Sequence, residues 1–433
     1  MAKIQRRGSW GLPAHSPKRA FSLGAVQNNP ALLAGDFSLT IGLGRSYGDV
    51  GLNSGQTIVT SSDQNHFLHF DSLKGSLKCQ AGVSLAEIQR TFIPQGYSLI
   101  ATPGTAQVSV GGAIANDVHG KNHHRVSSFG AHVSEITLLR TTGEIIVCSP
   151  QSNPSLFEAT IGGLGLTGMI LDATFKLKKV NSAYLLQDTL QFESVAEFLT
   201  LSKDSEQSHE YSVAWVDTSK RNFGRGFLMR ANIADDGDFS MPPAKAIELP
   251  MLPFGVVNKF SNAVLASAYR LVNSKEKTGA KVGYQQYFYP LDAISHWNHA
   301  YGPKGFYQYQ FVVPNENAEA AINEILRQVA LSGNQSFLSV LKTLGSQRPA
   351  GLLSFTRPGV TVALDFENRG ADTLTLFSRL DDVLREAGGA LNLSKDARMP
   401  KSLFEQSYPR YKELEALRDP GISSGLSRRL MGF

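Results

Sequence analysis

The stretch that decides the fold is Pro103-Gly104-Thr105-Ala106-Gln107-Val108-Ser109-Val110-Gly111-Gly112-Ala113-Ile114-Ala115-Asn116-Asp117-Val118-His119-Gly120-Lys121-Asn122-His123-His124. Its first half consists almost only of small residues, and its second half is dense in polar groups. Small residues let main-chain N–H groups approach a phosphate or a flat ring, and nests of such groups bind anions. The segment therefore predicts a loop that binds a phosphate-bearing or planar ligand.

Two other glycine clusters flank this stretch. Residues Leu39 to Ile41 predict a short strand that runs into a glycine-rich turn and then a loop, Gly42-Leu43-Gly44-Arg45-Ser46-Tyr47-Gly48-Asp49. The segment Gly163-Leu164-Gly165-Leu166-Thr167-Gly168 matches the dinucleotide fingerprint letter for letter. That fingerprint needs a strand before it and a helix after it, whereas here 154–160 predicts a helix capped by Asn153 and 169–177 alternates like a strand. A turn between helix and strand is therefore favoured over a Rossmann site.

Length and composition describe a globular protein of more than one domain. At about 150 residues per domain, 433 residues suggest two or three domains. Apolar residues make up 42% and charged residues 18% of the chain, which excludes a disordered or fibrous protein. Two cysteines, Cys79 and Cys148, are too few for a disulfide framework or a four-thiolate metal site. They favour a reducing compartment.

The charge balance and the lack of long apolar runs bear on partners and location. Lys and Arg exceed Asp and Glu by 5, which suits an anionic ligand or an acidic membrane surface but is too small to indicate nucleic acid. The first residues are basic but have no apolar run behind them, so no secretory signal is predicted. No stretch reaches the roughly 18 uninterrupted apolar residues of a membrane span. We expect a cytoplasmic protein, with peripheral association with the inner face of the membrane as the alternative.

Several blocks in one order carry a family resemblance. Together they resemble the FAD-binding domain of the vanillyl-alcohol-oxidase (PCMH-type) superfamily, and within it the decaprenylphosphoryl-ribose oxidase family, the flavin half of a two-enzyme epimerase. The blocks are Gly-Leu-Gly-Arg-Ser-Tyr-Gly-Asp at 42–49, Pro-Gly-Thr at 103–105, Val-Gly-Gly-Ala-Ile-Ala at 110–115 and His-Gly-Lys-Asn-His-His at 119–124. Further matches cover nearly the whole chain: Trp297 to Pro303, Gln308 to Phe311, and Lys395-Asp396.

The resemblance implies an α+β, two-domain PCMH-type fold with an antiparallel-sheet substrate cap. Its expected parts are an FAD-binding domain at 1–180, the cap at 181–389 and a C-terminal return to the FAD-binding domain at 390–433. The residue pattern itself predicts two amphipathic helices in the cap, 316–331 and 372–387, each followed by glycine and a strand, at 336–342 and 390–393. Helices alternating with strands suggest a sheet with helices on one face, and a final helix is expected near 403–417.

The resemblance also assigns roles to individual residues. The implied catalytic residues are Lys395, Gln310, His119 and Tyr47. Substrate contacts are implied for Gln308, Lys121, Lys342 and Asn392. Non-covalent FAD is the implied cofactor, with contacts from Ile41, Gly42, Leu43, Gly44, Arg45, Ser46, Tyr47, Gly48, Pro103, Gly104, Thr105, Ser109, Gly111, Gly112, Asn116, Val118, His119, Ile170 and Asn392.

The implied reaction is the oxidation of a secondary hydroxyl, the ribose 2′-OH of a polyprenyl-phosphoryl sugar, to a ketone. A partner reductase of the short-chain dehydrogenase type would then complete the epimerisation. Lys395 is either the base that accepts the hydroxyl proton or the anchor of the phosphate. Mycobacterial members carry cysteines where this chain has Ala363 and Asn116, so chemistry that depends on those thiols does not transfer.

Alternatives remain at three points. An aldonolactone or alditol oxidase of the same superfamily is the rival enzyme, although the His-Trp-x-Lys motif usual near the C-terminus of such enzymes is absent; a non-catalytic flavin-binding subunit is the second rival. His119, His123 and His124 have spacing that a metal cluster could use, but no carboxylate or thiol motif completes such a site, so no metal is expected. The apolar, proline-broken segment 249–259 is either a loop that covers the core or a mobile lid over a lipid-bearing substrate, with Arg270, Lys275, Lys277 and Lys281 following it.

Overall fold

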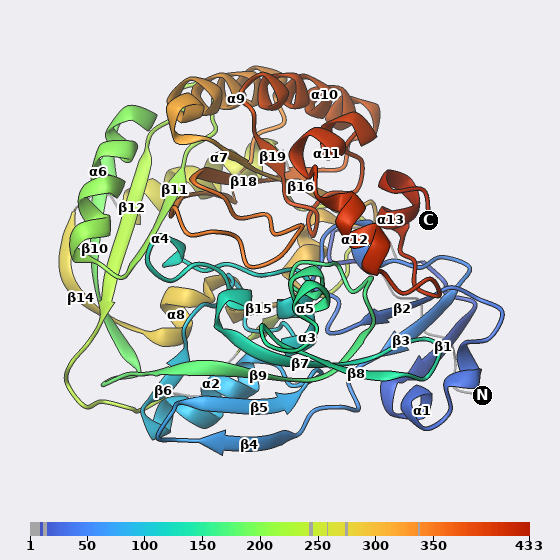
Figure 1. The fold of residues 1–433 in the computed structure, drawn as a ribbon. Coiled ribbons are helices and arrows are strands. Elements are labelled where there is room, and N and C mark those ends of the chain that lie inside the picture. Colours follow the sequence, from blue (N-terminus) through green and yellow to red (C-terminus); the bar gives the residue numbers. More distant parts are fainter. Residues whose placement is uncertain (1–8, 12–14, 242–245, 258, 273–275, 337) are drawn as a thin grey trace.

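The computed structural model describes residues 9–11, 15–241, 246–257, 259–272, 276–336 and 338–433. In this described part, the strands form four sheets, of which two are large and antiparallel (Figure 1). A six-stranded sheet carries β4 (Phe67–Asp71), β5 (Ser76–Gln80), β9 (Met169–Lys179), β7 (Val133–Leu139) and β8 (Ile145–Cys148), with β6 (Tyr97–Leu99) on β9. Beside it lies a small parallel sheet of β1 (Arg19–Ser22), β3 (Thr57–Thr60) and β2 (Ser38–Ile41).

Short helices join the strands of the six-stranded sheet. The sequence Ser84-Leu85-Ala86-Glu87 has the pattern that predicts a capping box, and this capping box is present at the start of α2 (Leu85–Phe92). The small-residue stretch supplies α3 (Val110–Ala115) and α4 (His123–Val126). Helix α5 (Pro154–Thr160) precedes the glycine-rich turn and β9 follows it, which confirms that this turn is no dinucleotide fingerprint. Asn153 is the N-cap residue of α5 and Pro154 its first residue, as predicted, but the Asn153 side chain donates to the carbonyl of Val147 and makes no capping hydrogen bond.

The larger sheet has eight strands among the described residues, ordered β14-β10-β12-β11-β17-β18-β16-β19. The strands are β10 (Tyr184–Phe192), β11 (Tyr211–Val216), β12 (Gly226–Ile233), β14 (Lys277–Gly283), β16 (Phe306–Val313), β17 (Ser339–Leu344), β18 (Gly359–Glu367) and β19 (Ala390–Leu391). The two predicted cap helices are α9 (Ala318–Ser332) and α10 (Ala371–Glu386). Together with α6 (Val195–Ser208), they lie on the outer face of this sheet (Figure 1).

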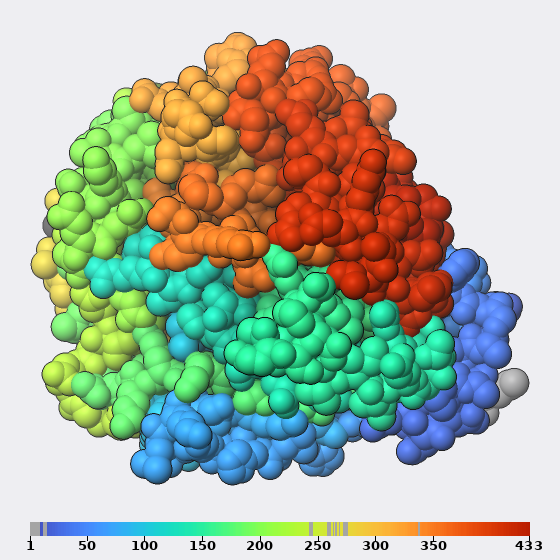
Figure 2. Space-filling model, viewed as in Figure 1, coloured from blue at the N-terminus to red at the C-terminus, as the bar shows by residue number. Residues whose placement is uncertain are grey.

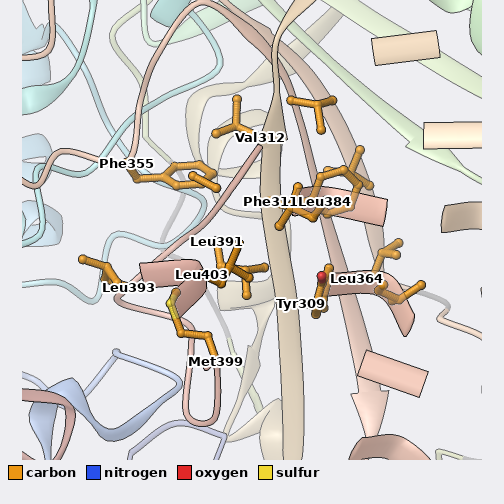
Figure 3. Close-up of a cluster of buried hydrophobic side chains, with 14 of the residues drawn as sticks. Tyr309, Phe311, Val312, Phe355, Leu364, Leu384, Leu391, Leu393, Met399 and Leu403 are labelled. Carbon is orange, nitrogen blue, oxygen red and sulfur yellow. The ribbon is translucent and has the colours of Figure 1, made fainter. Parts of the chain in front are cut away.

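Strand alternation decides which side chains this sheet buries under its helices. On β16 and β18, Tyr309, Phe311 and Leu364 enter the main hydrophobic core beside Leu391 and Leu403 (Figure 3). Burying one such side chain contributes roughly 1.5–3 kcal/mol, so this face holds the sheet and helices together. Because successive residues of a strand point to opposite faces, their neighbours Gln308, Gln310 and Asp365 must face the other way.

One helix departs from the expected one-sided arrangement. Helix α7 (Lys259–Val272) packs through Ala266 and Tyr269 on Trp215 and Phe227. These two aromatic residues are paired across β11 and β12, next to Ala214 and Leu228, which face the main core. Alternation therefore places α7 on the face opposite to α6, α9 and α10.

The C-terminal return differs from its prediction in two ways. The expected helix near 403–417 is two helices, α11 (Lys401–Ser407) and α12 (Tyr411–Leu417), because Pro409 cannot continue a helix. The predicted strand at 390–393 is shorter in the structure, where β19 covers Ala390–Leu391 and pairs with β16. The chain therefore leaves the large sheet after Leu391. The domain boundaries at 180 and 389 stay a prediction.

After the large sheet, the chain packs back on the flavin-side elements. Arg410, just before α12, pairs with Glu158 of α5 at 2.7 Å, and Figure 2 shows the red C-terminal segment seated on the green segment that carries α5. From α13 (Gly425–Leu430), Arg429 pairs with Asp49 at 2.9 Å. The two ends of the chain's folded part therefore meet beside the glycine-rich loop at 42–48.

Candidate active site

The inner face of the large sheet meets the glycine-rich loop at one buried cluster. The Nζ atom of Lys395 lies 3.6 Å from the centroid of the Tyr47 ring. Asn392 donates from Nδ2 to the side-chain oxygen of Gln310 at 3.0 Å, and Gln310 Nε2 lies 3.4 Å from His119 Nε2. Five residues predicted from separate parts of the sequence are thus brought together.

Backbone contacts join the glycine-rich loop to the segment that carries Lys395. The Tyr47 N–H donates to the carbonyl of Ser394 at 3.0 Å. A Cβ atom at Gly48 would lie 1.6 Å from the carbonyl oxygen of Asp396, so only glycine fits there. Asp396 in turn pairs with Arg429 at 2.8 Å and accepts hydrogen bonds from the Met399 N–H. The position of Lys395 is therefore set by the loop on one side and by the C-terminal return on the other.

The charge of Lys342 acts on two other buried lysines, Lys121 and Lys395. Burial, reinforced by the charge of Lys342, lowers the pKa of Lys121 to about 7 and that of Lys395 to about 7, although Asp365 opposes the fall for Lys395. Burial lowers the pKa of Lys342 itself to about 8. The pKa of His119 is lowered well below its usual value, first by burial and then by Lys342. A bound anion would offset this repulsion, so the cluster suits a negatively charged substrate.

Sequence reasoning placed Lys342 at the end of a strand, where a solvated charge was the alternative. The structure places it inside β17, paired with Thr361 of β18. Lys121 also differs from a surface charge, because its Nζ donates to the carbonyl of Tyr287 and lies 4.5 Å from the centroid of that tyrosine's ring. Lys121 is therefore held by Tyr287, whereas Lys342 is placed by the register of its strand.

Asp365 is a member of the cluster that sequence reasoning missed. It accepts a hydrogen bond from Gln308 Nε2 at 2.6 Å, directly across the β16–β18 pair. Burial raises its pKa to about 7, against the opposing effects of Gln308 and Lys395. A signal was present: an acidic residue two positions after Ala363, in an otherwise apolar buried strand, shares that residue's face of the sheet.

The loops around this cluster can hold FAD. No hydrogen bond among the described residues uses the amide N–H groups of Leu43, Gly44, Arg45 and Ser46, which leaves a row of donors for a diphosphate. The Oδ1 atom of Asn116, at the end of α3, is buried and has no hydrogen-bond partner among the described residues. Such an orphaned acceptor is costly unless a ligand donates to it. The donor set and this acceptor therefore fit a flavin nucleotide.

Close packing shapes the floor of that site. A Cβ atom at Gly42 would lie 2.0 Å from Ser109 Oγ, and one at Gly111 would lie 3.0 Å from the Ala81 Cβ. Ser109 itself accepts from the Gly112 N–H at 3.3 Å and so starts α3. Of the remaining predicted cofactor contacts, Ile41 is buried on β2, while Pro103 and Val118 are partly buried in the loops. These residues shape the backbone rather than offer polar side chains.

Three predicted cofactor contacts have other partners in this structure. Thr105 donates to Asp292 Oδ1 at 2.6 Å, so its hydroxyl joins the loop to the large-sheet side. Arg45 donates to the carbonyl of Leu43 at 2.8 Å and lies 4.2 Å from the Trp10 ring. Ile170 is 5% exposed and belongs to the core under α3, so it is not among the groups that converge.

The histidines after His119 serve the fold. His123 is buried, accepts from the Gly345 N–H at 3.1 Å through Nδ1, and has its pKa lowered to about 4, first by burial and then by Lys342. His124 lies near the carbonyl of His209, 3.4 Å away. Within the described residues, no group of three or more His, Cys, Asp or Glu side chains is placed to hold a metal ion.

The apolar segment 249–257 lies on the surface. Met251 is 54% and Phe254 is 63% exposed, so these two side chains are not part of the core. The segment is attached beside the active site, because the Val256 N–H donates to the carbonyl of Ala300 at 2.7 Å and Trp297 of the same turn contacts Tyr47.

Ion pairs reduce the charge available next to this segment. Arg270 pairs with Asp217 at 2.8 Å, and Lys281 pairs with Asp236 at 2.7 Å. Lys275 lies outside the described residues, and Lys277 is exposed. None of the helices in the described ranges is both long and apolar enough to cross a bilayer.

Comparison with known proteins decides the family. Residues 37–149 match a model of the FAD binding domain. Decaprenylphosphoryl-β-D-ribose oxidase of Mycolicibacterium smegmatis is 36% identical over 410 residues, which span 90% of this chain and 88% of that protein. The chain belongs to the decaprenylphosphoryl-β-D-ribose oxidase family. It is an FAD-dependent oxidoreductase with the two-domain α+β PCMH-type fold, which confirms the sequence prediction of family, cofactor and fold class.

More distant relatives match less than half of the chain. A putative D-arabinono-1,4-lactone oxidase of Neurospora crassa is 28% identical over 213 residues, 49% of this chain and 37% of that protein. L-gulonolactone oxidase of Bos taurus is 27% identical over 183 residues, 42% of this chain and 40% of that protein. The lactone oxidases thus match far less of the chain than the decaprenylphosphoryl-ribose oxidase does.

Proposed function

We propose that this member of the family oxidises the ribose 2′-hydroxyl of a polyprenyl-phosphoryl sugar to a ketone. Bound FAD supplies the acceptor for the two electrons and the hydrogen that leave the carbon as hydride. The observation that carries the proposal is the set of buried lysines around Tyr47 and Gln310, because it combines a base with a site for an anion.

Lys395 is proposed as the proton acceptor. A pKa lowered to about 7 by burial leaves much of the lysine as neutral amine near neutral pH, which a general base requires. When the hydroxyl O–H bond breaks, the proton goes to Nζ and the oxygen electrons form the carbonyl as hydride departs. Gln310 and Asn392 lie within reach to orient the sugar, since they already bond to each other beside His119.

Lys342 and Lys121 are proposed as the phosphate anchor. Both are buried cations with lowered pKa values, and neither pairs with a carboxylate among the described residues. A phosphate between them would restore their charge and gain strong ionic hydrogen bonds. With the phosphate bound by Lys342 and Lys121, Lys395 can accept the hydroxyl proton.

The lipid is proposed to leave the site along the exposed segment 249–257. Met251 and Phe254 offer apolar surface, and the segment is attached to the turn that contacts Tyr47. The same surface is proposed to rest on the inner face of a membrane, where such a substrate resides. Because each buried methylene adds about 0.8 kcal/mol, shorter lipids should have steeply higher KM.

The lipid path is tested with paired variants. Met251→Ser with Phe254→Ser should raise KM for the polyprenyl substrate and weaken co-sedimentation with anionic vesicles. Leu73→Ser is the control, since Leu73 is 96% exposed on the hairpin between β4 and β5. Equal KM values for a water-soluble sugar phosphate and the polyprenyl form would contradict the lipid path.

The substrate is tested by anaerobic flavin bleaching of the purified holoenzyme. A polyprenyl-phosphoryl ribose should bleach the flavin, and adding a short-chain dehydrogenase-type reductase with its nicotinamide cofactor should yield the epimer. Bleaching by an aldono-1,4-lactone or an alditol instead would favour the rival oxidases, to which the distant relatives belong. No bleaching by any of these alcohols would favour a non-catalytic subunit.

A further inference from the structure

Asp365 and Gln308 form a pair on the inner face of the large sheet that the proposed reaction does not yet use. They lie directly opposite each other on β16 and β18, and Gln308 Nε2 donates to Asp365 Oδ1 at 2.6 Å. No hydrogen bond among the described residues uses Asp365 Oδ2. A carboxylate in the interior with one amide donor is expensive unless a cation shares its environment.

Lys395 is the cation that shares it, because Lys395 and Gln308, which donates to Asp365, line the same small cavity. The carboxylate of Asp365 and the ammonium of Lys395 influence each other's pKa, although no direct ion pair joins them in the described contacts. Burial pushes both groups toward their neutral forms, raising the pKa of Asp365 and lowering that of Lys395, each to about 7. Two groups of opposite sign with similar pKa values in one buried site are poised to respond to one another's charge.

We propose that Asp365, held by Gln308, is the positioning residue for the base: its carboxylate stabilises the ammonium that forms when Lys395 takes the substrate's hydroxyl proton. The inference rests on the proposed role of Lys395. Before the step the pair is amine and carboxylate, and after it ammonium and carboxylate. Charge attraction in the protein interior is stronger than in solvent, so the carboxylate raises the pKa of Lys395, which burial alone would lower further.

Other titratable groups surround Asp365 and Lys395, and their effects on pKa values can be stated one by one. Lys342 from β17 lowers the pKa of Lys395, which opposes Asp365. Lys395 in turn contributes to the lowered pKa of His119. The hydroxyl groups of Tyr47 and Tyr301 have pKa values raised first by burial and then by Asp365, so both stay neutral and add no charge. Asp365 is therefore the acidic group that counters Lys342 at the base.

The test measures Lys395 directly in the holoenzyme. Competitive labelling with acetic anhydride across a pH series, read by peptide mass spectrometry, gives the pH at which Lys395 becomes reactive. In Asp365→Asn this pH should fall by about one unit, since the charge that favours ammonium is gone. Asp365→Glu keeps the charge and should restore most of the shift. An unchanged labelling pH in Asp365→Asn would overturn the proposal.

A matched control separates this role from a structural one. Asp381 is also buried, but it pairs directly with Arg398, at 2.6 Å from Nη2 to Oδ1, and accepts from the Tyr309 hydroxyl in the opposite core. Asp381→Asn should lower the melting temperature and leave the labelling pH of Lys395 unchanged. A shift of equal size in both variants would mean that general loosening, not the Asp365 charge, moves Lys395, and would overturn the proposal.

The pH dependence of kcat/KM gives a second test, which depends on the substrate. In Asp365→Asn, the ascending limb of kcat/KM against pH should move to lower pH, and the limiting rate should fall about 10-fold or more because the base is weaker. If polyprenyl-phosphoryl ribose fails to bleach the wild-type flavin, the proposed function fails. The labelling experiment needs no sugar substrate, so it still tests whether the charge of Asp365 changes the pKa of Lys395.

Discussion

The two walls of the active site are built by different means. The flavin-side wall, residues 42–48 and 103–119, offers backbone N–H groups and glycine positions where a Cβ atom has no room. The large-sheet wall offers side chains at alternate strand positions, such as Gln310 and Asp365. A backbone wall should be sensitive to added atoms, whereas a side-chain wall should be sensitive to changes of charge. Each prediction below tests that contrast.

The flavin should be released completely by acid. Covalent members of the superfamily attach the isoalloxazine through a side chain, often a histidine of the glycine-rich loop, whereas the loop here reads Gly44-Arg45-Ser46-Tyr47-Gly48. A wall of backbone donors holds the cofactor only while the protein is folded. Trichloroacetic acid precipitation should leave all the yellow colour in the supernatant, and a yellow pellet would contradict non-covalent binding.

Gly48→Ala should abolish flavin retention. The new Cβ would lie 1.6 Å from the Asp396 carbonyl oxygen, so the loop must separate from the lysine segment. Gly55→Ala is the control: its Cβ meets nothing within 4 Å at a φ of +70°, so it carries only the left-handed strain of about 1 kcal/mol. The measurement is the flavin-to-protein absorbance ratio after gel filtration. Equal ratios in the two variants would mean that the close approach at Gly48 is not needed.

Lys395→Ala should keep its flavin and lose turnover by roughly 10²–10⁴-fold, as expected for loss of a positioned base. Lys395→Arg keeps the charge but cannot readily accept a proton, so it should be equally inactive. Stopped-flow measurement of flavin reduction gives both rates. Substantial activity in the arginine variant would support the anchoring role of Lys395 instead, and near-normal turnover in the alanine variant would remove it from the reaction.

Lys342→Met should raise KM about 10-fold or more with a smaller change in kcat, because a binding contact mainly affects KM.

The same substitution should impair substrate binding without lowering the stability of the fold. The folded-state pKa of Lys342, about 8, lies below the unfolded value of about 10.5, so folding releases a proton and wild-type stability rises with pH through this window. The methionine variant should lack that contribution and melt no lower than wild type at pH 7. A lower melting temperature would mean that the lysine's contacts outweigh the cost of burying its charge.

Local signals were sufficient for much of the flavin-side wall. The capping box at Ser84 and the turn at 163–168 depend on neighbours within a few residues, and both were predicted correctly. Family motifs then placed Tyr47, His119 and Lys395, which the structure brings together. Pro409 is also a local signal, because proline cannot continue a helix, yet one helix was predicted across it near 403–417.

The sequence by itself determined the family, the cofactor and the alternation that separates the two faces of the large sheet, because these depend on short motifs and on the two-residue period of a strand. Only the tertiary structure decided that Asp365 shares an environment with Lys395, that Met251 and Phe254 are exposed, and that α7 covers the inner face. Burial and charge coupling depend on groups far apart in the chain, and these arise only when the β16–β18 pair, the loop at 42–48 and the segment at 392–396 are packed together.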